Sequence, residues 1–499
     1  MVTRAHTVAF LGVEAKPVEV QCALTPGLHA FNVVGLPDKA VSESRERVRA
    51  ALTAIGLALP PQRITVNLSP ADLPKAGSHY DLPIALALMA ALDLIPTEEI
   101  EGHVALGELS LDGTTKPVQG ALPAALAAAA EGKGLICPES CGAEAAWVGA
   151  AEVLAPPTLI DLVNHFAGRK ALTPPVPGPV AARRSAADLI DVKGQESARR
   201  ALEVAAAGNH HILMIGEPGS GKSMLASRLT GIMPPLSPEE ALEVSTIYSL
   251  AAQPGDGTIF KERPYRAPHH SASMPAMIGG GIQAKPGEIS LAHRGVLFLD
   301  ELPEFARPVL ESLRQPIETG EVVVSRANAH VRYPARFLLA AAMNPCRCGY
   351  LGDPGRACSR APRCGADYAA RLSGPLIDRF DIRVEVPPVS PDMLSLPPHG
   401  ETSAKIGRRV VEARAAQAGR TGGSRLTNGE LEGEVLDRVA TPDAPGQEVL
   451  RLATEKLRLT ARGYHRVLRL ARTLADLEGS DAVRKVHVAE AVGYRRALG

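Results

Sequence analysis

The sequence has no excess of either charge, few aromatic residues and no long hydrophobic run. Its 499 residues include 54 Lys and Arg and 54 Asp and Glu, so the formal net charge is zero. A neutral chain gives no sign of a nucleic-acid partner, although it is compatible with a local basic surface such as the lining of a pore. Aromatic residues make up only 3% of the chain, which argues against long platforms on which single-stranded bases stack.

No segment is long enough to cross a membrane. The longest apolar stretches, residues 82–92 and 121–130, are too short, and each contains a proline. Residues 1–15 have too short an apolar run for a secretory signal. The cysteine count is seven, an odd number in a chain without such a signal. We therefore expect no membrane partner, a cytoplasmic and reducing environment, and thiols that bind metal rather than form disulfides.

The length predicts about three domains at roughly 150 residues each, and the expected fold class is α/β. Residues 1–170 should form an α/β domain, 171–187 a Pro-rich linker, 188–395 a parallel-sheet core and 396–499 a helical domain. Within the first domain we predict strands at 18–23, 30–34 and 64–68, helices after Ser42 and at 82–92, and a hairpin at Asp112-Gly113.

The chain is organised around a phosphate-binding loop. An apolar run at 212–215 leads into G-x-x-x-x-G-K-S, and a helix-forming segment follows. The glycines let backbone N–H groups point at phosphate oxygens, and the helix adds its positive end. Lys222 would reach the β- and γ-phosphates of ATP, and the Ser223 hydroxyl would ligate Mg²⁺. The predicted nucleotide-binding residues of this loop are Gly216, Glu217, Pro218, Gly219, Ser220, Gly221, Lys222, Ser223 and Met224.

Two further buried strands end in residues that suit ATP hydrolysis. The run at 296–299 leads into Asp300-Glu301. One carboxylate is needed near Mg²⁺ and another to polarise the attacking water, so we expect Asp300 at the metal and Glu301 as general base. The run at 337–342 leads to Asn344, whose amide suits orientation of that water.

Two segments between these motifs are interpreted as insertions. Residues 263–295 are rich in glycine and proline, carry His269-His270, and are expected to face a pore or a neighbouring subunit. Metal binding by the histidine pair would require partners that the sequence does not show. Residues 321–331 predict a β-hairpin with Arg326 near its turn.

Four of the cysteines form a cluster in the sequence. Cys346, Cys348, Cys358 and Cys364 follow the pattern C-x-C-x9-C-x5-C. Four thiolates at close spacing suit a tetrahedral Zn²⁺ site, and the turn-rich segment 346–364 needs such a staple to be ordered. The spacing is looser than that of two C-x-x-C knuckles, so free thiols in a flexible loop are the alternative.

Together these motifs resemble the ComM/YifB family of magnesium-chelatase-like AAA+ ATPases over essentially the whole chain. NLSPADLPKAGSHYDLPIALALMAAL and LGELSLDGTTKPVQGALPAALAA are similar to the Lon-protease-like domain that begins these proteins, and LIDVKGQESARRALEVAAAG to the segment before an AAA+ P-loop. The resemblance implies a Lon-protease-like α/β domain, an AAA+ P-loop core and a C-terminal helical lid. It also implies that backbone around Gly194 and Gln195 contacts adenine.

The same resemblance assigns roles to three more residues. It implies that Asn344 is the sensor-1 residue, which orients the lytic water. It also implies that Arg462, at the N-terminal end of a predicted helix, is the sensor-2 arginine. Arg379, in LIDRFD, would be an arginine finger that reaches the γ-phosphate of a neighbouring subunit. The alternative is that Arg379 pairs with Asp378 or Asp381 on the surface.

The N-terminal domain is expected to be catalytically inactive. Lon uses a Ser–Lys dyad, and the matching positions here are Tyr80 or Asp81 and Leu122 or Pro123. Ser78 lies nearby, but no lysine is present in the matching helix. Because a nucleophile without an activating base is weak, we expect the domain to serve assembly or binding rather than peptide cleavage.

The resemblance implies a homohexameric ring that hydrolyses ATP and acts on DNA, as a branch-migration helicase does during natural transformation. The residues themselves leave the cargo open. A DNA translocase would track phosphates with basic pore loops. The alternatives are the motor subunit of a magnesium chelatase and an ATP-dependent protein remodeller.

Overall fold

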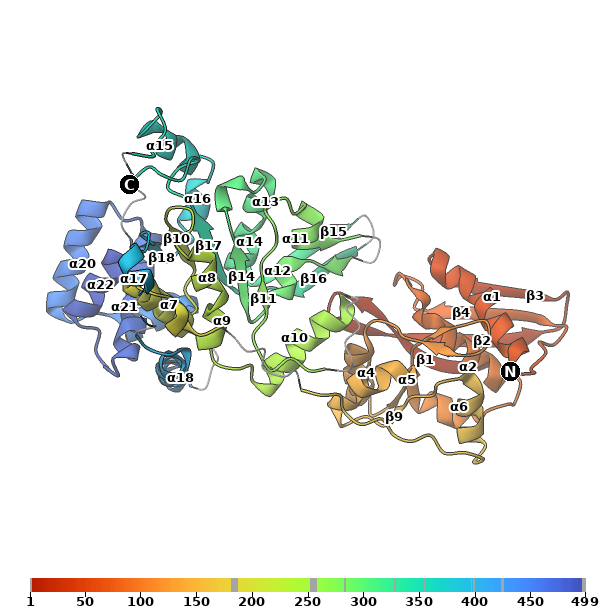
Figure 1. The fold of residues 1–499 in the computed structure, drawn as a ribbon. Coiled ribbons are helices and arrows are strands. Elements are labelled where there is room, and N and C mark those ends of the chain that lie inside the picture. The colour runs from red at the N-terminus through yellow and green to blue at the C-terminus, as the bar shows by residue number, and fades with distance from the viewer. Residues whose placement is uncertain are drawn as a thin grey trace.

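The computed structural model describes residues 2–180, 187–251, 258–281, 284–326, 329–353, 355–395, 397, 400–422 and 426–495, without the side chains of residues 325, 326, 329, 330, 391 and 394. Figure 1 shows an elongated molecule with an α/β half at its N-terminal end. A second α/β core lies in the middle, and the last helices lie at the far end.

The N-terminal half is built on a seven-stranded sheet of order β3-β4-β2-β1-β5-β8-β9. At its centre, β1 and β2 form a long antiparallel hairpin in which Val2 pairs with Ala23 and Leu11 with Glu14. The sequence prediction missed β1, because its apolar residues are interrupted by Arg4, His6 and Thr7. The strands are β1 (Val2–Leu11), β2 (Glu14–Thr25), β3 (Ala30–Val34), β4 (Arg63–Ser69), β5 (His103–Ala105), β8 (Gly134–Ile136) and β9 (Val153–Leu154).

Two helices of this half, α1 and α2, and its small hairpin lie where the sequence predicts them. Helix α2 is apolar all round, and its residues Asp81 to Ala90 are all buried. The predicted turn at Asp112-Gly113 joins β6 (Glu108–Leu109) to β7 (Thr115–Lys116) in antiparallel pairing. The helices are α1 (Lys39–Ala54), α2 (Asp81–Ala91), α3 (Thr97–Glu101), α4 (Ala121–Ala130), α5 (Glu139–Ala145) and α6 (Leu159–Phe166).

The second sheet has five parallel strands in the order β11-β14-β17-β10-β18. Because both faces are covered, the central strands are continuous apolar runs. The register places Ile215 opposite Met343 and Glu385. Residues that follow β10, β14 and β17 therefore meet at the edge of the sheet formed by the carboxyl ends of its strands. The strands are β10 (Ile212–Ile215), β11 (Tyr265–Arg266), β14 (Val296–Leu299), β17 (Leu338–Met343) and β18 (Ile382–Glu385).

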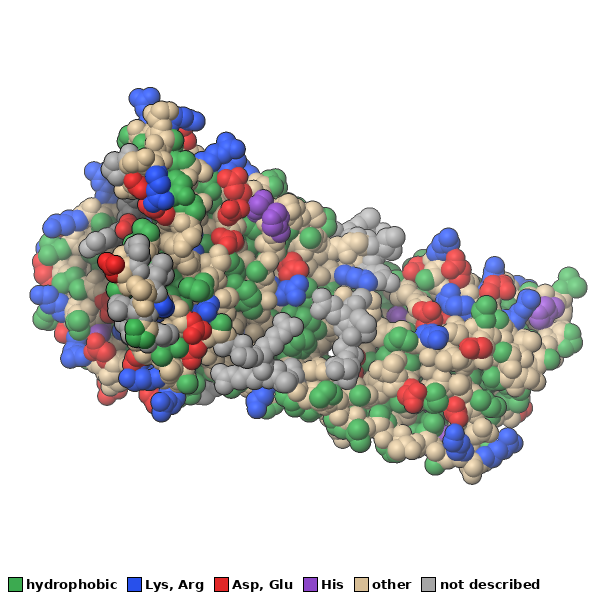
Figure 2. All heavy atoms as spheres, in the orientation of Figure 1, with side chains coloured by type: hydrophobic (Ala, Val, Ile, Leu, Met, Phe, Trp, Pro, Cys, Tyr) green, Lys and Arg blue, Asp and Glu red, His purple; other side chains and the backbone are tan. Residues whose placement is uncertain are grey.

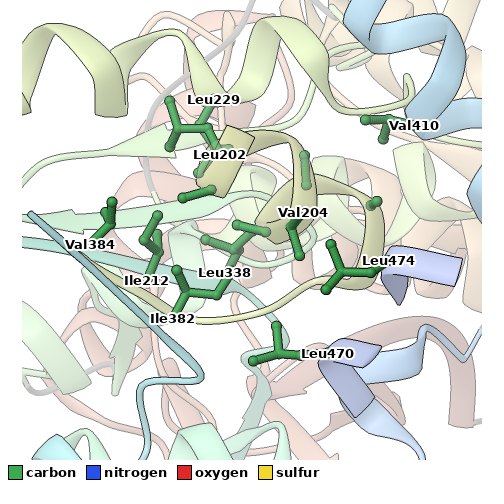
Figure 3. Close-up of a cluster of buried hydrophobic side chains, with 14 of the residues drawn as sticks. Leu202, Val204, Ile212, Leu229, Leu338, Ile382, Val384, Val410, Leu470 and Leu474 are labelled. Carbon is green, nitrogen blue, oxygen red and sulfur yellow. The ribbon is translucent and has the colours of Figure 1, made fainter. Parts of the chain in front are cut away.

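The C-terminal helices share a hydrophobic core with this sheet. Figure 3 shows Leu202 and Val204 of α7 close to Ile212, Leu338 and Ile382 of the strands and to Leu470 and Leu474 of α21. The last helices are therefore packed onto the core through α7. They are α18 (Ser403–Arg420), α19 (Gly433–Ala440), α20 (Ala444–Leu457), α21 (Ala461–Leu477) and α22 (Lys485–Gly493).

Short helices and hairpins complete the core. The helices are α7 (Glu196–Gly208), α8 (Lys222–Ser227), α9 (Leu229–Ile232), α10 (Pro238–Leu250), α11 (Met274–Ile278), α12 (Glu288–Leu291), α13 (Arg307–Ser312), α14 (Arg314–Thr319), α15 (Arg363–Ala369), α16 (Gly374–Ile377) and α17 (Pro391–Ser395). The hairpins are β12 (Gly279–Gly280) with β13 (Lys285–Pro286), and β15 (Glu321–Arg326) with β16 (Ala329–Pro334).

The interpretation of residues 263–295 as an insertion is wrong for part of the segment. Strand β11 pairs in parallel with β14, so Tyr265 and Arg266 form the edge of the core sheet. Ile289 of α12 is fully buried in the core. The predicted hairpin at 321–331 is confirmed as β15 and β16, while the Arg326 side chain lies outside the described residues.

The two halves are in contact. The turn between β1 and β2 lies against β16, where a Cβ at Gly12 would be 2.2 Å from the carbonyl oxygen of Arg332. The N–H of Gly120, at the start of α4, donates to the carbonyl of Ser249 in α10. The described part of the predicted linker has no helix and returns to the N-terminal half, since Gly178 N–H donates to the carbonyl of Ala143.

Candidate nucleotide-binding site

Lys222 lies at the start of α8, where the chain leaves the carboxyl end of β10. Its side chain is only 7% exposed. The ammonium donates to the carbonyls of Gly216 and Glu217, each at 2.8 Å, and to Oδ1 of Asn344 at 3.2 Å. Burial lowers the pKa of Lys222, while Asp300 and Glu301 oppose that shift. The structure thus places the predicted P-loop lysine next to the predicted sensor asparagine.

Glycine is required at two positions of this loop. A Cβ at Gly216 would lie 2.1 Å from the carbonyl oxygen of Val386, which follows β18. Gly219 has φ +78°, and a Cβ there would meet no atom within 4 Å. The loop is therefore packed tightly against the sheet on the Gly216 side and faces open space at Gly219.

Asp300 and Glu301 follow β14 at the same edge of the sheet. The Ser223 hydroxyl donates to Oδ2 of Asp300 at 2.5 Å, and Oδ1 of Asp300 accepts the N–H of Glu301 at 2.9 Å. Glu301 has φ +52°, an uncommon left-handed conformation for a non-glycine residue. Its carboxylate lies 3.2 Å from Nδ1 of His270. Sequence reasoning missed this role of His270, because no spacing relates it to Glu301.

Gln195 connects the segment before α7 to the P-loop. Gly194 and Gln195 both have left-handed backbone, with φ +65° and +63°. The Gln195 amide donates to the carbonyl of Ser220 at 3.2 Å and to that of Pro387 at 2.5 Å. Its Oε1 is buried with no hydrogen-bond partner. The two residues predicted near adenine therefore lie beside the loop.

The side chains at this edge fit ATP and Mg²⁺. Ser223 and Asp300 offer a hydroxyl and a carboxylate oxygen within hydrogen-bonding distance of one another, the hard donors that Mg²⁺ prefers. Lys222 supplies a buried cation for phosphate. Gly219 leaves space above the loop for the backbone to approach a ligand closely.

Arg379 and Arg462 do not lie at this edge of the sheet. Arg379 precedes β18, and the neighbouring Asp381 N–H bonds to the carbonyl of His211 at the amino end of β10. Arg379 is 4% exposed and donates to the carbonyl of Pro375 at 2.6 Å and to Glu318 at 2.5 Å. Arg462 is exposed and lies 3.9 Å from the same Glu318 carboxylate.

Arg379 therefore lies near the amino ends of the parallel strands, whereas Lys222 lies at their carboxyl ends, and Arg462 is beside the same glutamate as Arg379. The predicted alternative for Arg379 is not observed either. Asp378 pairs instead with Arg495, and Asp381 pairs with Arg466.

The cysteine cluster lies at the P-loop edge, because Cys346 follows β17 by three residues. The sulfur atoms of Cys346, Cys348 and Cys364 lie within 4.8 Å of one another. The hydrogen bond from Cys346 lowers the pKa of Cys348 to about 6, and burial raises the pKa of Cys364 to about 12. Cys358 contacts both of these thiols. The structure thus brings three of the four predicted ligands within ligand distance of one another, and the fourth, Cys358, lies next to them.

The positions that match the Lon dyad are held by structural interactions. Tyr80 is fully buried, and Asp81 accepts two hydrogen bonds from Arg47, at 2.6 and 2.9 Å. Leu122 lines a cavity of about 1040 Å³ between the two halves, together with Ser78 and His79. This cavity contains none of the P-loop residues.

Figure 2 shows Lys and Arg side chains interspersed with Asp and Glu on the face that it presents. Among the described residues, no helix combines the length and hydrophobicity needed to cross a bilayer.

Comparisons with known proteins match nearly the whole chain. A family model described as "Magnesium chelatase, subunit ChlI" matches residues 188–394. Models described as "Subunit ChlI of Mg-chelatase" and "Magnesium chelatase, subunit ChlI C-terminal" match residues 18–141 and 400–495.

Three similar proteins differ in how much of the chain they cover. Competence protein ComM of Haemophilus influenzae is 43% identical over 496 residues, covering 98% of this chain and 96% of ComM. The uncharacterized protein YifB of Escherichia coli is 42% identical, with the same two coverages. The magnesium-chelatase 38 kDa subunit of Rhodobacter capsulatus is 27% identical, covering 60% of this chain and 83% of the subunit.

Proposed function

Because the chain belongs to the ComM/YifB family of magnesium-chelatase-like AAA+ proteins, we propose that it is an ATP-hydrolysing ring motor that translocates on or remodels DNA. The observation that carries the ATPase part is the meeting of Lys222, Ser223, Asp300 and Asn344 at one sheet edge. The cofactors are ATP, Mg²⁺ and one structural Zn²⁺ at the cysteine cluster. The assembly is a homohexamer of the branch-migration helicase type, acting in DNA uptake or recombination.

Each side chain at the edge has a role in hydrolysis. Lys222 binds the β- and γ-phosphates, and Ser223 with Asp300 holds the magnesium. Glu301 takes the proton of the attacking water, and Asn344 orients that water. His270 holds the Glu301 carboxylate in place. ATP supplies the phosphoanhydride bond whose hydrolysis drives motion.

The arginines complete the site of a neighbouring subunit. Arg379 and Arg462 lie beside Glu318, near the amino ends of the parallel strands, while their own P-loop is at the carboxyl ends. An arginine supplied by the next subunit neutralises transition-state charge and raises the rate by orders of magnitude. This arrangement requires a ring or another closed oligomer.

DNA is the cargo that the family relationship favours. A relative that covers nearly the whole chain is called a competence protein. The β15–β16 hairpin carries Arg332, whose side chain is 75% exposed and suits contact with phosphates in a central channel. The N-terminal domain, without its dyad, serves assembly or binding.

A magnesium-chelatase motor subunit is the second candidate. The matched family models carry that name, and a chelatase subunit is a relative. However, the relationship to that subunit covers only 60% of this chain, against 98% for ComM. A protein remodeller is the third candidate, and the ATPase site alone does not distinguish it from a DNA motor.

The decisive measurement is the rate of ATP hydrolysis without DNA and with single-stranded, duplex and branched DNA. We expect DNA to increase the rate, and binding to weaken as salt increases because phosphate contacts release counterions. Lys222→Ala should abolish nucleotide binding. Glu301→Gln should retain nucleotide and DNA binding but lose turnover.

Two outcomes would contradict the proposal in different ways. Hydrolysis that no DNA stimulates, together with no salt-sensitive DNA binding, would favour the chelatase or remodeller candidates. Full turnover by Glu301→Gln would remove Glu301 from the mechanism.

A further inference from the structure

The cysteine cluster has the geometry of a metal site rather than of disulfides. All seven cysteines of the chain are free thiols. Zn–S bonds of about 2.3 Å put tetrahedral ligand sulfurs about 3.8 Å apart, and three of these sulfurs already lie within 4.8 Å of one another. Cys346 and Cys364 are buried, while Cys348 and Cys358 are partly exposed. Among the described residues, this is the only such group of three or more His, Cys, Asp or Glu side chains.

The loop between these cysteines has little core of its own. From Cys348 to Arg363 nearly every described residue is exposed or half-buried, and helix begins only at Arg363. Ordering such a loop costs conformational entropy, and metal binding by its side chains can offset that cost. Four thiols provide that staple without a hydrophobic core.

The loop lies against the phosphate-binding loop. Gly349 has φ +89°, and a Cβ there would be 2.5 Å from Cγ and 2.6 Å from Cδ of Pro218. Arg356 forms an ion pair with Glu217 at 3.1 Å and stacks over the Tyr350 ring at 4.2 Å. Glu217 and Pro218 are P-loop residues, so the cysteine loop contacts the phosphate-binding loop directly.

The same metal site is connected to Lys222 through the backbone. Asn344, which accepts a hydrogen bond from Lys222, lies only two residues before Cys346. Fixing Cys346 therefore also fixes the strand end that positions Asn344. The cysteine loop thus contacts the nucleotide site both through Pro218 and Glu217 and through Asn344.

We propose that Cys346, Cys348, Cys358 and Cys364 bind one Zn²⁺ and that the zinc-bound loop braces the P-loop, so that metal occupancy controls nucleotide affinity. This role rests on the proposed nucleotide binding at Lys222, but the metal site does not. Loss of zinc releases Gly349 from Pro218 and frees Glu217. The P-loop then has to be ordered by the nucleotide itself, which weakens binding.

Metal content tests the site itself. Elemental analysis of reduced, purified protein should find one zinc per chain. Cys346→Ser/Cys364→Ser should lose it, and Cys141→Ser, which removes a buried thiol outside the cluster, should keep it. If the double variant does not fold, Cys358→Ser should instead release zinc to a chelator faster than wild type. No metal, iron in place of zinc, or equal retention in all variants would overturn the metal site.

Two variants that keep all four thiols test the brace. Gly349→Ala forces the loop away from Pro218 and should weaken binding of a fluorescent ATP analogue about tenfold, an overpacking effect, while retaining one zinc. Gly355→Ala lies in the same loop without a P-loop contact and should bind like wild type. Equal affinity of Gly349→Ala and Gly355→Ala would overturn the brace. Zinc-loaded wild type that binds no nucleotide would instead contradict the proposed function and leave the metal site standing.

Discussion

At the residue scale, the candidate site holds one charge, that of Lys222, where water is scarce. Lys222 keeps its ammonium inside the fold by donating to two backbone carbonyls and to Asn344. Removing water from a charge is costly unless such partners are present. The geometry of the loop therefore already provides the contacts that orient Lys222 toward an incoming phosphate.

His270 is the positioning residue that we expect to matter most for Glu301. His270→Ala should lower kcat on the order of tenfold, as loss of a supporting partner typically does, with little change in KM. His269→Ala is the matched control, because His269 contacts Ser271 rather than Glu301. Steady-state kinetics of both variants check this, and His270→Gln should recover part of the rate. Equal kcat in His269→Ala and His270→Ala would contradict the role.

His79 makes the stability of the N-terminal half depend on pH. Burial lowers the pKa of His79 from 6.5 to about 4, although its contact with the Val8 carbonyl opposes the shift. Between these pH values the unfolded chain binds a proton that the folded chain does not. Stability from this group is therefore present above pH 6.5 and is lost as the pH falls toward 4, by up to about 3 kcal/mol.

The only tryptophan of the chain, Trp147, reports on unfolding of this half. The denaturant midpoint of its fluorescence should fall between pH 7.5 and pH 5. His79→Gln keeps a nitrogen that can donate to Val8 but does not titrate, so its midpoint should fall less. The same pH dependence in both proteins would exclude His79 as the cause.

At the scale of elements, the candidate site is made by the carboxyl ends of three parallel strands. Each of β10, β14 and β17 is an apolar run followed by polar residues, a pattern that is visible in the sequence. Neighbouring strand ends then bring these groups together. The edge strand β11 was not predicted, because two residues carry too little pattern.

Gly216 is where the P-loop meets β18, so Gly216→Ala should destabilise the fold more than Gly219→Ala. Gly216→Ala puts a Cβ against the Val386 backbone, which cannot retreat without breaking its bond to Ile215. We expect it to lower the free energy of unfolding by about 3 kcal/mol, the upper end for overpacking. Gly219→Ala meets no atom and should cost only about 1–2 kcal/mol of backbone strain. Denaturation followed by circular dichroism checks the order, and a larger loss in Gly219→Ala would contradict it.

At the scale of the whole molecule, the two arginines that the sequence predicts for catalysis lie together, away from Lys222 of their own chain. Arg379 is nearly buried and is held by Glu318, with Arg462 beside the same carboxylate. In an assembled ring the γ-phosphate of the neighbouring subunit would have to draw Arg379 away from Glu318. Within one chain, neither Arg379 nor Arg462 lies at the strand ends that carry Asp300 and Asn344.

Mixing two inactive variants tests that arrangement. Arg379→Ala and Lys222→Ala should each lack turnover. Random mixed rings should regain activity, because an Arg379→Ala subunit keeps its Lys222 and a neighbouring Lys222→Ala subunit can supply an intact Arg379. At equal amounts about one interface in four is complete, so about a quarter of the wild-type rate is expected. A mixture with no recovered hydrolysis would contradict the trans role.

The sequence by itself determined the family and predicted the residues of the proposed nucleotide site, because a phosphate-binding loop and strand-end carboxylates are local patterns. It also predicted the cysteine cluster, since four thiols lie within one short loop. Only the tertiary structure decided that His270 contacts Glu301, that Arg379 and Arg462 share Glu318, and that the cysteine loop lies on Pro218. Those contacts join residues far apart in the chain, and their geometry depends on how strands and helices pack, which no spacing in the sequence encodes.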